Sequence, residues 1–106
     1  MTVSQFPSLL CQLSSAKRHL AYSAVGDVNS PHVLLCLPGL LETRATFDPV
    51  LTLAQRVPGI RVIALDHCGR GDSDPLPGDA GYTMSVYLQD IVAFLRQEVM
   101  RPGQPV

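Results

Sequence analysis

Residues 32–37 read His-Val-Leu-Leu-Cys-Leu and run directly into Pro38-Gly39. A continuous apolar run of this length, bounded by turn residues, predicts a strand that is buried on both faces, as in a parallel sheet. Residues 61–66, Arg-Val-Ile-Ala-Leu-Asp, repeat the pattern. The sequence therefore predicts two buried parallel strands.

The segment between these strands has apolar residues at helical spacing over 47–57. We expect Thr46 to cap this helix, and Pro49 falls in the first turn, where a missing N–H costs little. Pro58-Gly59 ends the helix. Together the three segments predict a β-α-β unit with a right-handed crossover.

Two further segments flank this unit. Residues 9–13 and 17–25 are apolar or alternate with period two, which predicts an antiparallel hairpin. Thr83 caps a second helix that Pro102-Gly103 ends. Its expected apolar face consists of Met84, Leu88, Ile91, Val92, Leu95 and Val99.

Composition limits the possible functions of this 106-residue chain. It is 46% hydrophobic and only 16% charged, below the roughly 25% usual for soluble domains, so part of its surface is expected to face more protein. The net charge is −1 and the only adjacent basic pair is Lys17-Arg18, which argues against nucleic-acid binding. No apolar run is long enough to span a membrane.

The cysteines bear on compartment and on metal binding. Cys11, Cys36 and Cys68 are odd in number and widely spaced, so we expect free thiols in a reducing cytoplasm. Their spacing matches no zinc pattern, and the glycines match no dinucleotide fingerprint. We therefore predict neither a metal nor a cofactor.

Three motifs occur in order along the chain: Pro38-Gly39, then Phe47-Asp48-Pro49, then Asp-x-x-Gly-x-Gly-x-Ser-Asp at 66–74. Together, over about residues 17–100, they resemble the N-terminal part of an α/β-hydrolase-fold enzyme. The resemblance implies an α/β fold with a β-hairpin followed by β-α-β-α. Residues 1–106 would then form an incomplete domain, with no second domain.

The resemblance also suggests site residues. In this family the loop after the third strand supplies a backbone N–H that stabilises the developing oxyanion. That role falls to Leu40 here, with Leu41 as a weaker candidate. Gly39, which lacks a Cβ, would permit a sharp turn and close approach of substrate. His67, at the carboxyl end of the next strand, could line the substrate pocket; the alternative, which we favour, is a loop histidine bonded to backbone.

The family's nucleophile lies in a G-x-S-x-G turn, followed along the chain by the acid and the histidine. No such turn occurs in these 106 residues. The resemblance thus implies part of a hydrolase that cleaves an ester, lactone or related small acyl substrate. We expect this chain alone to be inactive. One edge of strand 32–37 would need the rest of the enzyme or a second copy to cover it.

Two alternatives compete with this interpretation. The chain could be a non-catalytic α/β binding or assembly module. Gly71-Asp72-Ser73 also resembles the nucleophile motif of another esterase group, although no histidine follows His67. In the α/β-hydrolase interpretation Ser73 and Asp74 instead bond local backbone and shape the loop.

Overall fold

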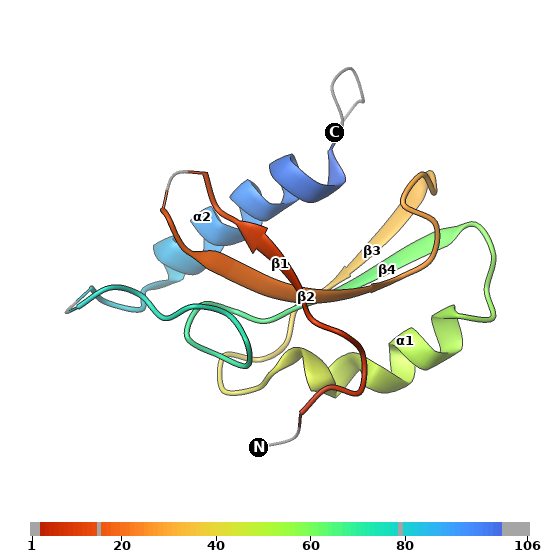
Figure 1. Ribbon diagram of the computed structural model, residues 1–106, viewed down its shortest axis with the longest axis horizontal. Helices are drawn as coiled ribbons and strands as arrows, with labels where there is room; N and C mark the ends of the chain where they lie inside the picture. The colour runs from red at the N-terminus through yellow and green to blue at the C-terminus, as the bar shows by residue number, and fades with distance from the viewer. Residues whose placement is uncertain (1–2, 15, 79, 101–106) are drawn as a thin grey trace.

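A four-stranded mixed sheet forms the centre of the molecule (Figure 1). The computed structural model describes residues 3–14, 16–78 and 80–100. The strand order is β1-β2-β4-β3, with β4 parallel to β3 and antiparallel to β2. The strands are β1 (Leu9–Gln12), β2 (His19–Val25), β3 (His32–Cys36) and β4 (Ile60–Leu65).

Helices cover both faces of the sheet (Figure 1). A 3-10 turn, η1 (Arg44–Phe47), leads into α1 (Asp48–Ala54), and α2 (Met84–Phe94) continues into a π-helical turn, η2 (Leu95–Val99). Alternate residues of β4 face opposite helices: Ile63 and Leu65 join the cluster under α2, whereas Val62 and Ala64 join the cluster under α1. Burial on both faces explains why β4 is apolar apart from Arg61.

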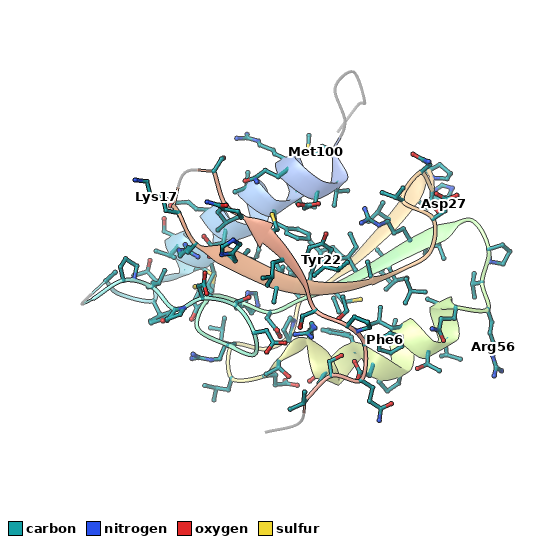
Figure 2. All side chains as sticks on the ribbon, viewed as in Figure 1. Phe6, Lys17, Tyr22, Asp27, Arg56 and Met100 are labelled. Atoms are coloured by element: carbon teal, nitrogen blue, oxygen red, sulfur yellow. The ribbon has the colours of Figure 1, made fainter. Side chains whose placement is uncertain are left out.

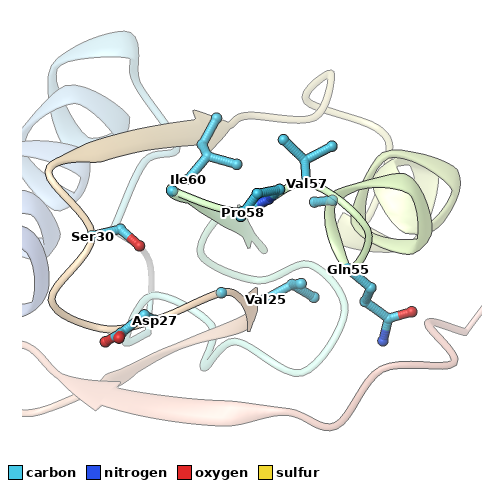
Figure 3. Close-up of a pocket in the computed structure, with 10 residues that line it drawn as sticks. Val25, Asp27, Ser30, Gln55, Val57, Pro58 and Ile60 are labelled. Carbon is cyan, nitrogen blue, oxygen red and sulfur yellow. The ribbon is translucent and has the colours of Figure 1, made fainter.

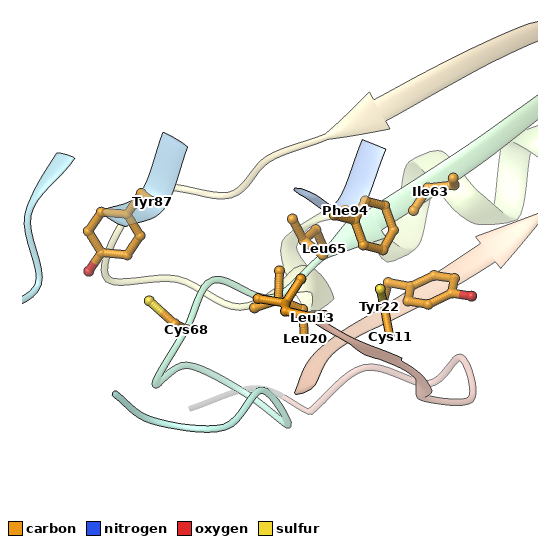
Figure 4. Packing of buried hydrophobic residues seen from close by; sticks show 9 residues of the cluster. All are labelled: Cys11, Leu13, Leu20, Tyr22, Ile63, Leu65, Cys68, Tyr87 and Phe94. Atoms are coloured by element: carbon orange, nitrogen blue, oxygen red, sulfur yellow. The ribbon is translucent and has the colours of Figure 1, made fainter. Parts of the chain in front are cut away.

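The larger core cluster lies between α2 and the sheet (Figure 4). Phe94 of α2 meets Tyr22 of β2 edge to face, with ring centroids 5.0 Å apart, a favoured geometry for aromatic pairs. Cys11, Leu13 and Leu20 complete this side from the hairpin. On the other face α1 contributes Leu51 and Ala54, and Phe6 packs beside them (Figure 2).

The predicted hairpin, both parallel strands and both helices are present, so the α/β prediction is confirmed. The cap and the end of the first helix were predicted wrongly: α1 ends at Ala54 rather than at residue 57. Thr43, not Thr46, is the capping residue: its hydroxyl accepts from the Ala45 N–H and begins η1, while α1 itself begins at Asp48. Pro49 lies in the first turn of α1, as predicted. The predicted stop at Pro102-Gly103 lies outside the described residues.

The buried face of α2 also differs from the prediction. The helix buries Tyr87, Asp90 and Phe94, whereas Met84, Leu88 and Val92 are 60%, 54% and 43% exposed. Asp90 is buried because Arg18 forms a two-pronged ion pair with its carboxylate, at 2.6 and 2.8 Å. The apolar stripe that periodicity selected is therefore divided: these three residues face outward, whereas Ile91 and Val99 pack against the core.

Strand β3 occupies the edge of the sheet, as expected, but the prediction that it is buried on both faces is wrong, because three of its five residues are exposed. Its only strand partner within the described residues is β4. Val33 and Leu34 remain 38% and 46% exposed in this strand. An apolar edge strand of this kind is rare on a free surface, because unpaired backbone groups template further strand pairing.

Candidate functional site

The loops that follow β3 and β4 lie at the same edge of the sheet. The two strands are parallel, and Cys36 near the end of β3 is in register with Ala64 near the end of β4. Residues 37–43, the β3 loop, therefore lie beside residues 66–74, the β4 loop. In open α/β sheets ligands bind at this carboxyl edge.

Side chains of the β4 loop hold two carbonyls of the β3 loop. Nε2 of His67 lies 3.0 Å from the Pro38 carbonyl oxygen, and because a carbonyl only accepts, this nitrogen is the donor. Nε of Arg70 donates to the carbonyl of Leu40 at 2.8 Å. The position of the β3 loop thus depends on two side chains distant in sequence.

A third bond lies within the β3 loop itself. The amide of Glu42 donates to the Gly39 carbonyl at 2.9 Å and closes a turn around Leu40 and Leu41. These two side chains are 43% and 83% exposed. Across the described part of the chain, no side-chain or backbone acceptor bonds their amide N–H groups.

Gly39 has a backbone conformation that other residues can adopt, while its expected place beside the substrate stays a prediction. Its φ lies outside the left-handed region, so the turn does not require glycine conformationally. A Cβ there would lie 2.9 Å from Oε1 of Glu42, the end of a flexible side chain. The glycine leaves the loop uncrowded rather than making a sharp bend possible.

His67 lies at the carboxyl edge, and its residue is only 6% exposed. Its ring meets Tyr87 of α2 edge to face, at 5.3 Å between centroids and 73° between planes. With its Nε2 directed at Pro38, His67 is held in one orientation. This geometry serves the β3 loop directly and offers substrate little imidazole surface.

A buried ion pair beneath the loops was not predicted from the sequence. Asp66 is fully buried and Arg44 is 3% exposed. Both the backbone N–H and Nη1 of Arg44 donate to the Asp66 carboxylate, and Nε donates to Ser23 of β2 at 2.8 Å. Arg44 and Asp66 are too far apart in sequence to form a local pattern. The pair becomes evident only in the structure, where the Arg44 guanidinium is buried.

The same network reaches the surface through Asp72. Its carboxylate accepts from the Ser8 hydroxyl and from Nη1 of Arg44, the latter at 3.0 Å. These two contacts, the Ser8 hydrogen bond first, hold the pKa of the Asp72 carboxyl below its ordinary value. The network therefore joins the N-terminal segment to η1 and to the β4 loop.

Ser73 is a structural residue of the β4 loop. It is 7% exposed. Its hydroxyl donates to the Asp66 carbonyl at 2.7 Å and accepts from the Ala21 N–H of β2 at 2.8 Å. A hydroxyl occupied in this way has no base beside it and no access to substrate, which argues against Ser73 as a nucleophile.

The three cysteines are unpaired and buried. Burial raises the pKa of the Cys11 thiol to about 12, and it also raises the pKa values of Cys36 and Cys68. Since the thiolate is the reactive form, these side chains are poor nucleophiles at neutral pH.

A pocket of about 410 Å³ lies at the opposite end of the sheet, near the start of β4 (Figure 3). Val25, Pro58 and Ile60 are among its lining residues. The carboxyl-edge loops take no part in it. A second hollow lies on the outer face of α2, beside Leu88 and Val92.

The described residues contain neither a metal-binding cluster nor a helix that could span a membrane. Within residues 3–14, 16–78 and 80–100, no three histidine, cysteine or acidic side chains gather as a metal site would require. None of the helices in this part of the chain is long and apolar enough to cross a membrane.

No family model matches the sequence. A curated relative, the 3-hydroxybutyrate-oligomer hydrolase of Cupriavidus necator, is 35% identical over 86 residues. The match covers 80% of this chain but only 28% of the relative. The chain thus spans less than a third of the length of that relative.

Solved structures match the fold over nearly the whole chain. An α/β hydrolase from Novosphingobium aromaticivorans is 35% identical with a TM-score of 0.68, covering 92% of this chain and 33% of that one. A haloalkane dehalogenase from Paraglaciecola agarilytica is 25% identical with a TM-score of 0.73, covering 91% and 32%. A thioesterase domain of the curacin biosynthetic pathway has a TM-score of 0.77 at 22% identity, covering 97% and 36%.

These matches agree with a mixed sheet that helices cover on both faces. Each covers about a third of the matched hydrolase. The chain therefore has the α/β-hydrolase fold over about one third of such a domain.

Proposed function

We propose that this chain is the N-terminal part of a serine-type α/β-hydrolase that cleaves an ester, lactone or related small acyl substrate. One observation carries the proposal. The amides of Leu40 and Leu41 bond no acceptor within the described residues and lie in an exposed turn at the carboxyl edge of the sheet.

Acyl transfer places negative charge on the carbonyl oxygen of the substrate. Backbone N–H groups already aimed at that oxygen stabilise the charge without reorganising, an effect worth about 2.7–4 kcal/mol per donor. The amide of Leu40 is our first candidate and that of Leu41 the second. In this proposal Gly39 keeps the approach open, and His67 holds the Pro38 carbonyl of the loop.

The substrate class is supported by the curated relative. Its name describes hydrolysis of oligomers of a hydroxy acid, whose units are joined by ester bonds. We extend only the ester chemistry to this chain. The nucleophile, acid and histidine would come from further protein, because the 106 residues contain no G-x-S-x-G. This chain alone would therefore be inactive.

Two apolar surfaces support the need for further protein. Val33 and Leu34 are exposed on edge strand β3, and Met84, Leu88 and Val92 are exposed on α2. The rest of the hydrolase, or failing that a second copy of this chain, would cover them. Three buried unpaired thiols favour the reducing cytoplasm as the location.

The test begins with the reading frame that encodes this chain. We expect it to continue past Val106 into a strand and G-x-S-x-G, and the protein made from it to hydrolyse p-nitrophenyl esters. A fluorophosphonate probe should label the new serine in that protein. The 106-residue chain should stay unlabelled.

Two controls make the result decisive. S73A should leave labelling unchanged, since the Ser73 hydroxyl is bonded within the fold. A continuation into unrelated sequence, or labelling at Ser73, would overturn the proposal. Sedimentation of the 106-residue chain tests the apolar surfaces separately: we expect self-association, and a stable dilute monomer would count against their role.

A further inference from the structure

The β3 loop is held through its carbonyl groups. His67 bonds the carbonyl of Pro38, and Arg70 bonds the carbonyl of Leu40. No peptide bond of the described chain is cis. In a trans peptide the N–H points opposite to the C=O of the same unit. A side chain that fixes a carbonyl on one side therefore aims an N–H toward the other.

The held carbonyls fix the direction of the candidate donor N–H groups. The Pro38 carbonyl shares its peptide unit with the Gly39 N–H, and the Leu40 carbonyl shares its unit with the Leu41 N–H. The peptide unit between them consists of the Gly39 carbonyl and the Leu40 N–H. Its carbonyl oxygen accepts from the Glu42 amide nitrogen at 2.9 Å. Three successive peptide planes are thus anchored by their carbonyls, with their N–H groups directed away from the anchors.

The side chain that bonds the Leu40 carbonyl, Arg70, is positively charged. Arg70 donates through Nε at 2.8 Å and through Nη1 to the Gly69 carbonyl at 3.2 Å, and its guanidinium lies 5.9 Å from the Tyr82 ring centroid. No acidic side chain of the described residues forms an ion pair with it. A cation that bonds a carbonyl polarises the whole peptide and strengthens its N–H as a donor.

We propose that Arg70 and His67 are positioning residues of the oxyanion hole, acting through the peptide units on either side of Leu40. The inference rests on the proposed function, because it assigns the loop amides to the substrate oxyanion. Neither side chain touches the substrate. Their role is to hold the amides in the direction that the transition state needs, so their loss lowers kcat rather than binding.

The first experiment measures the loop itself in the hydrolase encoded by the complete reading frame, where the apolar surfaces are expected to be covered. NMR should detect scalar coupling across the hydrogen bond from Arg70 Nε to the Leu40 carbonyl carbon. In R70M the amide signals of Leu40 and Leu41 should shift and broaden. R56M is the matched control: Arg56 is exposed at the far end of α1 (Figure 2), and its loss should leave these signals unchanged.

The second experiment uses the hydrolase encoded by the complete reading frame. We expect R70M to lower kcat about 10- to 100-fold with KM changed less than about threefold. This is less than the roughly 100- to 1,000-fold loss on removing an oxyanion donor outright, because the amides remain and only their positioning is lost. R70K keeps the charge and one donor and should recover part of the rate. H67Q keeps an N–H donor near Pro38, whereas H67F keeps only the ring against Tyr87, so H67Q should be the faster of the two.

The outcomes separate the two proposals. If the wild-type hydrolase is active and the R70M and H67F variants retain normal kcat, the positioning role is overturned and the proposed function still stands. A raised KM with unchanged kcat in R70M also overturns it, because Arg70 would then bind a substrate carboxylate instead. A correctly folded wild-type protein without any esterase activity overturns the proposed function, whatever the NMR result. Unchanged Leu40 and Leu41 signals in folded R70M overturn the positioning role independently.

Discussion

The two loops at the carboxyl edge differ in what holds them in place. The β4 loop is built around buried groups: Asp66, Ser73 and their partners are almost fully enclosed. The β3 loop projects outward, with Leu41 83% exposed, and bonds the rest of the fold through main-chain carbonyls. The β4 loop therefore forms a rigid support, and the β3 loop presents main-chain amides from it.

This difference explains why the β4 loop carries a long, recognisable motif at 66–74, whereas the β3 loop carries only the short motif Pro38-Gly39. Glycines, aspartates and a serine of the β4 loop each meet a specific steric or hydrogen-bonding demand, so their spacing is strict. The β3 loop works through backbone atoms that any residue possesses. Substitutions in the support should therefore affect stability strongly, whereas those in the β3 loop should affect it little.

The largest effect is expected at the buried ion pair. R44M leaves the Asp66 carboxylate without its guanidinium in a fully buried site. Breaking a buried pair by removing one partner costs about 3–5 kcal/mol. Urea denaturation of the 106-residue chain should show this loss, while exposed Arg56 substituted as R56M should cost less than about 0.5 kcal/mol. Equal midpoints for the two variants would contradict the buried network.

The next largest effect is expected at Gly71. Its φ is +53°, and an added Cβ would clash with the Asp66 carboxylate. G78A provides a matched control, because Gly78 has φ +52° with no atom within 4 Å of an added Cβ. We expect G78A to cost about 1–2 kcal/mol from the backbone alone, and G71A about 1–3 kcal/mol more from the clash. Equal melting temperatures for G71A and G78A would show that the β4 loop shifts to make room for the added methyl group, and would contradict the prediction.

A smaller effect is expected at Asp72, where the network reaches solvent. Its depressed pKa means that the ionised carboxylate stabilises the folded chain above the unfolded value of about 3.8. D72N should cost less than about 1 kcal/mol at neutral pH, because the side chain is exposed. Urea midpoints of wild type and D72N should converge as the pH falls below about 3.8 toward the folded pKa. A gap that persists through that acid range would contradict the assignment.

The smallest effect is expected in the β3 loop. G39A places a methyl group against the flexible end of Glu42 without requiring an unusual φ. The loss of unfolded-state freedom offsets this contact, so stability should change by no more than about 0.5 kcal/mol. A destabilisation as large as that of G71A would abolish the distinction between the two loops.

The strands and helices followed from local pattern because each carries its own periodicity and turn residues. The strand segments of 32–37 and 61–66 were recognisable from unbroken apolar runs, and the hairpin from alternation. The buried face of α2 was not recognisable. Asp90 lies on that face because it forms an ion pair with Arg18, whereas a periodicity of apolar residues assigns a charged residue to the exposed face.

The site was predictable to a lesser degree. The motifs located the two loops, and the structure brings them together at one edge. Arg44 was missed because its partners lie 21 to 36 residues away in sequence. The assignment of Leu40 and Leu41 as oxyanion donors stays a prediction until a hydrolytic reaction is measured.

The strand order has a consequence for synthesis. β4 is the partner of both β2 and β3, which do not pair with each other, yet it follows both along the chain. At about 5–20 residues per second, the ribosome adds the roughly 40 residues between Val25 and Leu65 in about 2–8 s. During this interval the β1–β2 hairpin can close, but apolar β3 has no partner. Release of residues 60–65 from the exit tunnel is therefore the event that commits the nascent chain to its sheet.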